Sequence, residues 1–209
     1  KCIMCYTDHH KKIKSTLKIE QLDKFLEECK KFKVPAIIIG LGSEVLMYKG
    51  IKDVVKKVMQ ADFLDVMFST NATLLNEEMS KFLIETGVTR IVVSLDAAND
   101  ETYKTIRSKN ELGKVEANIN LLINLKKKYK TKLPVIRLSF VVQKENINEI
   151  QKFKEKWSKA VDYIDIQEQI DFGPVKEIEK WDKEENFDLG EKVTTDTNCS
   201  YPFNSLHLY

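Results

Sequence analysis

Two cysteines lie close together near the start of the chain, in Cys2-Ile3-Met4-Cys5. Two thiols at this spacing form a redox dithiol, half of a zinc site or part of an iron–sulfur site. A complete zinc site of this type would need a second C-x-x-C, which the sequence does not contain. A thioredoxin-like dithiol would lie inside a strand–helix–strand unit. The spacing alone leaves all three roles open.

Ser94 and Asp96 form a second polar pair, at the end of an apolar run. Residues two apart in a strand point to the same face, and a hydroxyl beside a carboxylate suits the hydroxyl groups of a ribose. Buried polar side chains need hydrogen-bonding partners, so the pair predicts a bound ligand. The alternative role for Asp96 is to cap the helix that follows.

The chain alternates between apolar β-branched runs and amphipathic runs of helical period, the pattern of a parallel sheet covered by helices. Continuous runs rich in Val and Ile are typical of strands buried on both faces. One amphipathic stripe places Cys29 and Phe32 in the core, and Asn76 and Asn146 are expected as helix N-caps. The predicted strands are Ala36–Gly42, Asp65–Asn71, Arg90–Asp96, Val135–Val142 and Tyr163–Gln167.

Nearly every predicted strand ends in polar residues. An open doubly wound sheet concentrates its ligand groups at one switch point, whereas a barrel brings the carboxyl ends of all its strands to one mouth. The distribution of polar residues therefore favours the barrel. We predict an α/β fold over residues 1–172, a partial (β/α)6 TIM-like barrel, followed by the start of a small C-terminal extension.

The apolar pattern weakens after Ile170. Residues 173–198 are charged and poor in apolar side chains, which predicts a linker or surface loop. Cys199 follows, and Leu206 and Leu208 alternate as in a short strand. We therefore expect residues 199–209 to begin a second small domain with the first arm of a hairpin. Because the chain opens at Lys1 without an initiator Met, we also expect it to be a segment of a longer protein.

The composition is that of an ordinary globular protein, with 43% hydrophobic and 32% charged residues among 209. The 34 basic and 32 acidic residues leave a net charge of +2, which does not indicate a surface for nucleic acid. No apolar run approaches the roughly 20 residues that a membrane-spanning helix needs. Four cysteines without a secretory segment indicate a reducing compartment, and we expect a cytoplasmic protein.

The order of these motifs resembles the radical S-adenosylmethionine (radical SAM) enzymes. The C-x-x-x-C-x-x-C signature of that family matches Cys2–Cys5 in its last four positions, and its first cysteine would lie three residues before Lys1. The resemblance covers about residues 1–170. It implies that Cys2 and Cys5 bind a [4Fe–4S] cluster whose open iron takes the amino and carboxylate groups of SAM.

The resemblance also implies a SAM site. Gly42-Ser43-Glu44 resembles the family's Gly-Gly-Glu turn, which contacts the SAM amino group, although Ser43 replaces a glycine and Val45 the usual proline. Arg107 resembles the arginine that pairs with the SAM carboxylate, for which a planar guanidinium is suited. The alternatives are an ordinary loop at a helix start for Glu44 and a surface ion pair for Arg107. The remaining cofactor-binding candidates are Met4 against the adenine, Asn71, and Ser94 and Asp96 at the ribose.

Cys199-Ser200-Tyr201-Pro202-Phe203 further resembles the start of a SPASM or twitch extension, which in this family holds auxiliary [4Fe–4S] clusters, so Cys199 is expected to be a metal ligand. The implied activity is reductive cleavage of SAM to a 5′-deoxyadenosyl radical that abstracts hydrogen from a peptide or a small, sugar-like substrate. Flavodoxin or ferredoxin would donate the electron, and neither a membrane nor nucleic acid is expected as a partner. The competing hypothesis is a non-catalytic barrel module that binds zinc or a nucleotide.

Overall fold

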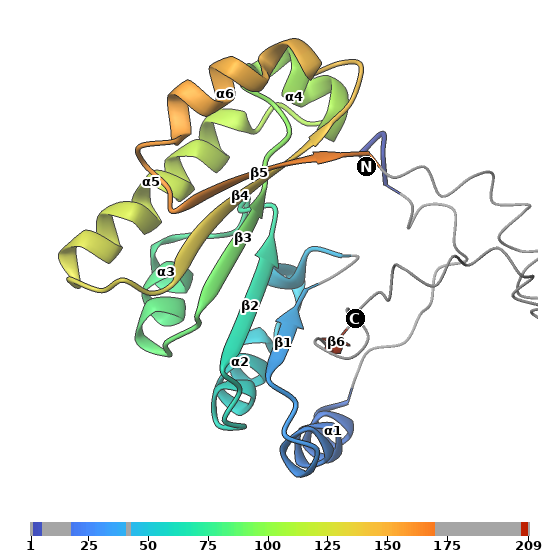
Figure 1. Ribbon diagram of the computed structural model, residues 1–209, viewed down its shortest axis with the longest axis vertical. Coiled ribbons are helices and arrows are strands. Elements are labelled where there is room, and N and C mark those ends of the chain that lie inside the picture. The colour runs from blue at the N-terminus through green and yellow to red at the C-terminus, as the bar shows by residue number, and fades with distance from the viewer. Residues whose placement is uncertain (1, 6–17, 41–42, 170–205, 209) are drawn as a thin grey trace, which may run out of the picture.

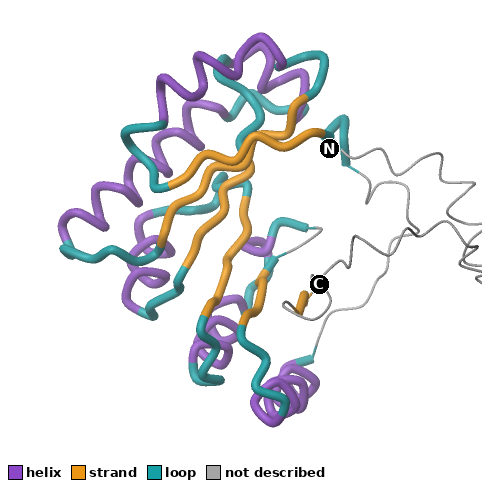
Figure 2. Tube along the Cα trace, viewed as in Figure 1, coloured by secondary structure: helices purple, strands orange, loops and turns teal. Residues whose placement is uncertain are grey.

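The computed structural model describes residues 2–5, 18–40, 43–169 and 206–208 (Figures 1 and 2). Gly42, Cys199 and the predicted linker lie outside these residues, so the expectations for them stay predictions. The strands are β1 (Ala36–Ile39), β2 (Asp65–Thr70), β3 (Arg90–Ser94), β4 (Val135–Val142), β5 (Tyr163–Glu168) and β6 (Leu206–Leu208). The helices are α1 (Ile19–Lys31), α2 (Ile51–Met59), α3 (Glu77–Glu85), α4 (Asp100–Arg107), α5 (Leu112–Lys128) and α6 (Ile150–Trp157), with short 3-10 turns η2 (Val45–Met47) and η3 (Ile147–Glu149).

The strands form one parallel sheet in the order β5-β4-β3-β2-β1-β6. From β1 to β5, each strand lies beside the one that precedes it in the chain, so the order never reverses. A doubly wound sheet reverses its strand order at the switch point. Figure 1 shows α3, α5 and α6 along one side of the curved sheet. These features confirm the predicted α/β fold of partial-barrel type.

The short strand β6 extends this sheet at its β1 edge, in the register Ile37↔Leu206, Ile38↔His207 and Ile39↔Leu208. A strand at this point of the sequence was expected from the alternation of Leu206 and Leu208. The pairing differs from the expectation, because β6 runs parallel to a barrel strand and not in a separate hairpin. The predicted domain boundaries at residues 172 and 198 remain predictions.

The apolar runs had suggested strands buried on both faces, but most strands are fully buried on one face only. Along β2 and β3, buried and half-buried residues alternate, whereas β1 and β4 each bury three successive residues. The buried side of the sheet packs against the helices, where Phe140 meets Phe153 with ring centroids 4.8 Å apart. One face of the sheet therefore makes the core, and the opposite face carries more of the polar residues of the strands.

The predicted stripe on α1 is correct for Cys29 and wrong for Phe32. Cys29 is buried in the structure, and this burial raises the pKa of its thiol. Phe32 follows the last residue of α1 as its C-cap and is 70% exposed, because the chain leaves the helix there. Asn76 caps α3 as predicted, with its side chain accepting a hydrogen bond from the amide of Met79 at 2.9 Å.

Candidate functional site

Four of the predicted site residues lie on the loops that follow β1, β2 and β3 and on the last turn of α4. Because the strands are parallel, their carboxyl ends meet at one edge of the sheet. Glu44 follows β1, Asn71 follows β2, and Asp96 follows β3. The sheet therefore brings together groups that lie more than twenty residues apart in the sequence.

The two N-terminal cysteines are attached to this edge through α4. The amide of Ile3 donates a hydrogen bond to the carbonyl of Ile106 at 3.0 Å, and the amide of Cys5 donates to the carbonyl of Cys2 at 3.2 Å. The second bond closes a tight turn, so both half-buried thiols belong to one compact loop. Met4 lies in this turn and is half-buried as well. Within the described residues, no group of three His, Cys, Asp or Glu side chains forms a metal site.

Arg107 connects the cysteine loop to the end of β3. Its Nη2 forms an ion pair with Oδ2 of Asp96, and its Nη1 donates to Sγ of Cys2 at 3.6 Å. The side chains are only 14% exposed for Arg107 and 1% for Asp96. Arg107 is therefore no surface ion pair, which was the alternative role considered for it.

The charge of this arginine is well supported. Burial lowers the pKa of the Arg107 guanidinium, but the neighbouring Asp96 carboxylate and Cys2 together raise it by more. The pKa of Arg107 is therefore shifted upward. Nε of Arg107 is buried and has no hydrogen-bond partner among the described residues. A buried donor without an acceptor is costly. The arrangement fits a ligand that brings an acceptor, such as a carboxylate, to Arg107 beside Cys2.

Asp96 is held on both carboxylate oxygens by groups of the protein. β3 ends at Ser94, so Asp96 lies in the loop after the strand and not within it, as the pair had been expected to do. Oδ1 of Asp96 accepts a hydrogen bond from the amide of Val141 at 2.9 Å, while Oδ2 binds Arg107. This geometry favours Asp96 as a group that positions Arg107 over a direct contact with ribose. Ser94 is half-buried and lies in register with Ser139 of β4.

Asn146 joins the ends of β3 and β4, a role that the sequence did not reveal. Its Nδ2 donates to the carbonyls of Asp96 and Val141, each at 2.9 Å, and its Oδ1 accepts from the amide of Gln143 at 2.7 Å. The residue precedes η3, but its side chain makes no capping hydrogen bond. Asn146 is therefore the N-cap residue of η3, as predicted, but without a side-chain cap, because its fully buried amide serves the strand ends instead.

Glu44 lies between the ends of β1 and β2. Its Oε1 accepts hydrogen bonds from the Thr70 hydroxyl at 2.7 Å and from the Leu46 amide at 3.2 Å. Its Oε2 accepts one from the Asn71 amide at 2.6 Å. Glu44 does precede the short helix η2, as the alternative role required, yet its carboxylate also spans the two strand ends. Ser43 beside it is exposed.

A glycine makes this approach of the two strand ends possible. Gly40 has φ = +88°, and a Cβ there would lie 2.7 Å from the carbonyl oxygen of Ser69 and from Cβ of Val45. No other residue type fits such a contact at that φ. Sequence reasoning singled out Gly42 and overlooked Gly40, two residues earlier in the sequence.

Asn71 is occupied by its own turn. Its Oδ1 accepts hydrogen bonds from the Thr73 amide at 2.9 Å and from the Thr73 hydroxyl at 2.7 Å. Asn71 therefore has a local role within the turn that follows β2. In the part of the chain that the structure describes, no hydrogen bond joins the Glu44 group to the Arg107 group. They are two separate charged positions on one edge of the sheet.

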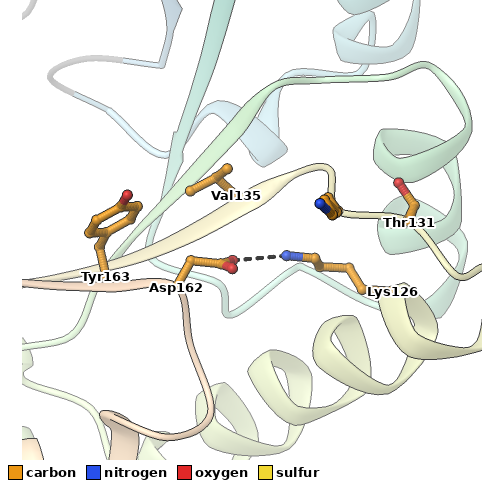
Figure 3. Close-up of a pocket in the computed structure, with 6 residues that line it drawn as sticks. Lys126, Thr131, Val135, Asp162 and Tyr163 are labelled. Carbon is orange, nitrogen blue, oxygen red and sulfur yellow. Dashed lines mark hydrogen bonds and ion pairs between the residues drawn. The ribbon is translucent and has the colours of Figure 1, made fainter.

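A shallow hollow lies at the opposite, amino-terminal edge of the sheet (Figure 3). Lys126 at the end of α5 forms an ion pair with Asp162 at 2.8 Å, drawn as a dashed line. Asp162 also accepts a hydrogen bond from the amide of Ile136 at 2.7 Å. These contacts tie α5 to β4 and the start of β5, far along the strands from the candidate site. The hollow is lined by Lys126, Thr131, Lys132, Val135, Asp162 and Tyr163.

Fold and site define a partial α/β barrel with a thiol pair, a buried arginine and an anchored carboxylate at its mouth. Residues 1–156, three quarters of the chain, match the family described as "Radical SAM superfamily". The chain belongs to this superfamily. Enzymes of the superfamily use a [4Fe–4S] cluster and SAM. The resemblance to radical SAM enzymes and the two cofactors, SAM and a [4Fe–4S] cluster, are thereby confirmed, whereas the SPASM or twitch extension and its auxiliary clusters stay predictions. None of the described helices is long and apolar enough to cross a membrane.

Curated relatives include proteins named "Probable GTP 3′,8-cyclase". That of Methanocaldococcus jannaschii is 28% identical over 177 residues, which is 84% of this chain and 56% of the relative. That of Methanothermobacter thermautotrophicus is 31% identical over 124 residues, or 59% of this chain and 40% of the relative. The chain thus spans about half the length of the curated relatives it matches.

Two solved structures share the fold. One is native anSMEcpe with bound AdoMet and the Kp18Cys peptide, with a TM-score of 0.63 and 20% identity over 82% of this chain and 48% of that chain. The other is Streptococcus suis SuiB bound to the precursor peptide SuiA, with a TM-score of 0.65 and 16% identity over 81% of this chain and 36% of that chain. These likenesses support the partial barrel.

Proposed function

We propose that this chain forms the cofactor-binding barrel of an enzyme that cleaves SAM reductively and removes a hydrogen atom from its substrate. The observation that carries the proposal is the contact of Arg107 with both Asp96 and Cys2, which joins the cysteine loop to a strand end at the mouth. When bound, the cluster would supply one electron to SAM, and the S–C5′ bond of the sulfonium would break to give methionine and a 5′-deoxyadenosyl radical.

The residues of the chain have distinct tasks in this proposal. Cys2 and Cys5 bind two irons as thiolates, and a third thiolate comes from the cysteine expected before Lys1. Arg107 offers a cation to the SAM carboxylate, and Glu44 offers an anion to the SAM ammonium. Two opposite charges at separate places on one edge suit an amino acid moiety that carries both charges. Ser94 remains the candidate for the ribose, with Met4 against the adenine.

The test compares the Cys2→Ala/Cys5→Ala variant of the full-length protein with Cys29→Ala. Cys29 lies in the core and has no place in the proposed site. After anaerobic reconstitution, we expect the double variant to lose the absorbance near 400 nm that comes from this cluster, and all formation of 5′-deoxyadenosine. Cys29→Ala retains both. Formation of 5′-deoxyadenosine by the double variant contradicts the proposal, and a colourless wild type with stoichiometric zinc supports the binding module instead.

SAM binding is tested with Glu44→Ala, Ser94→Ala and Arg107→Ala in the cluster-loaded protein. Loss of a hydrogen bond to a charged group costs about 1.5–3 kcal/mol, which corresponds to roughly ten- to a hundred-fold in affinity. We expect each variant to bind SAM more weakly while its iron content is unchanged. Calorimetry that finds the wild-type affinity in all three variants would contradict the assignment.

The substrate is the finer part of the proposal. Two relatives are named as GTP cyclases, so GTP is the first substrate to test, and peptides follow because two structures of the same fold hold peptides. A tested compound is identified as a substrate if it raises the rate of 5′-deoxyadenosine formation with reduced flavodoxin or ferredoxin as the electron donor. Cys199 is proposed as the ligand of an auxiliary cluster that accepts the substrate electron.

A further inference from the structure

The Glu44 carboxylate is held from three sides, and one of the holding groups is a side chain. The Thr70 hydroxyl and the Leu46 amide both donate to Oε1, whereas Oε2 accepts only from the Asn71 amide. A carboxylate offers about four acceptor positions. With three of them used by the protein, the fourth, on Oε2, is left for a cationic ligand.

The hydrogen of the Thr70 hydroxyl has a fixed direction. The residue is the last of β2 and is only 3% exposed. Its Oγ1 accepts a hydrogen bond from the amide of Ala72 at 3.0 Å, which occupies a lone pair. The single hydroxyl hydrogen is therefore available for Glu44, at 2.7 Å from Oγ1 to Oε1. Water has little access to compete for this buried bond.

The turn that carries these donors is itself fixed. Ala72 has φ = +59° although it is not glycine, and it is fully buried. A left-handed residue of this kind persists only where the surroundings hold it. Nδ2 of Asn118 in α5 donates to the carbonyl of Ala72 at 2.8 Å, while Thr70 binds its amide. The turn therefore fixes the positions from which Thr70 and the Asn71 amide reach Glu44.

We propose that Thr70 is a positioning residue for Glu44, whose hydroxyl fixes the carboxylate so that its remaining acceptor position receives the ammonium of SAM. The inference rests on the proposed function, because it takes Glu44 as the partner of that ammonium. Thr70 itself does not touch the cofactor. Its effect passes through the orientation of Glu44, so a variant without the hydroxyl weakens SAM binding and leaves the cluster in place.

The test uses Thr70→Val, which keeps the shape and removes the hydroxyl, and Thr70→Ser, which restores the hydroxyl. Thr89→Val is the matched control, because Thr89 also donates to a carboxylate, that of Asp65 at 2.6 Å, at the amino end of β2. In the cluster-loaded full-length protein, we expect Thr70→Val to raise the Kd for SAM roughly ten-fold by calorimetry. Thr70→Ser and Thr89→Val stay within about two-fold of wild type, and iron content is unchanged in all three.

A second readout needs no cofactor. In the cluster-free protein, we expect the amides of Leu46 and Asn71 to be protected from hydrogen exchange, because both donate hydrogen bonds to Glu44. We expect Thr70→Val to speed their exchange, because the carboxylate is no longer pinned, and Thr70→Ser to restore it. The Met79 amide donates a hydrogen bond to Oδ1 of Asn76, and its exchange rate should be the same as in wild type if the fold is intact. If Thr70→Val does not fold, Thr70→Ala takes its place.

Glu44→Gln separates the two levels of the proposal. If Glu44→Gln weakens SAM binding and Thr70→Val does not, the inference about Thr70 is overturned and the role of Glu44 stands. If Glu44→Gln binds SAM like wild type, both fall. Weaker binding in each variant, with no further loss in the double variant, supports the proposal, because the two groups then act as one unit.

Discussion

Replacing Asp96 by Asn removes the negative charge that pairs with Arg107 and leaves the guanidinium buried without a counter-charge. The amide has the shape of the carboxylate and still offers Oδ1 to the amide of Val141, but its NH2 group then meets the Arg107 guanidinium donor to donor. Removing one partner of a buried ion pair costs about 3–5 kcal/mol. Because 14% of the Arg107 side chain reaches solvent, we expect the lower end, about 3 kcal/mol. For a chain of this size, that loss lowers Tm by roughly 6–12 °C.

The assay is chemical denaturation of the cluster-free protein near pH 7.5, followed by circular dichroism, with Arg107→Met and the double variant completing a cycle. If the two groups act as a pair, the double variant loses less free energy of unfolding than the two single variants together, by about 2 kcal/mol. Glu78→Gln, which breaks the exposed pair with Lys52, is the control and leaves the midpoint where it was. Additive losses in the cycle, or an Asp96→Asn variant as stable as wild type, would refute the reasoning.

Three further predictions use other parts of the chain. Gly40→Ala is expected to weaken SAM binding in calorimetry and to lower Tm more than Gly87→Ala does, because a Cβ at Gly40 meets backbone at 2.7 Å whereas one at Gly87 has its nearest neighbour at 3.9 Å; equal effects would exclude the steric cause. The pKa of Asp162 is lowered, since the Ile136 amide and Lys126 outweigh the opposing effect of burial, so the stability that Asp162 adds is present above its unfolded pKa of about 3.9 and is lost as pH falls through the lower folded pKa. The free energies of unfolding of wild type and Asp162→Asn, measured in urea, differ by less than about 1 kcal/mol near neutral pH and should converge in acid; a difference that grows in acid contradicts this sign. Cys199→Ala, at a position outside the described residues, is expected to lose about four irons and product formation while SAM cleavage continues, and unchanged iron content would make Cys199 a bystander.

The fold was predictable because its signal is local and repeated. The predicted range of β4 agrees with the structure at both ends, and β2, β3 and β5 agree to within two residues. Five alternating units all favour one arrangement, so an error in one unit does not change the result. β6 shows the limit of this reasoning. Its short alternation predicts a strand, but which strand it pairs with is decided by a free sheet edge elsewhere.

The residues of the candidate site were predictable by type, and their contacts were not. Glu44 and Arg107 were found because a carboxylate and an arginine stand at family positions. Nothing in the sequence indicates that Thr70 holds the first or that Asp96 holds the second. Both contacts depend on side-chain direction at a strand end, where a shift of one residue changes which face a group takes.

Burial separates the two kinds of polar residue at this edge of the sheet. Thr70, Asp96 and Asn146 are each at least 97% buried, and each is bonded to neighbouring protein groups. Cys2, Cys5 and Ser94 are only half-buried. A fully buried polar group must find its partners within the protein, so the first set holds the scaffold, while the second set is left within reach of a cofactor. The sequence alone cannot separate the two sets, because a hydroxyl, an amide or a carboxylate at a strand end can either hold the scaffold or bind a cofactor. The depth at which the fold buries the group decides between these two roles.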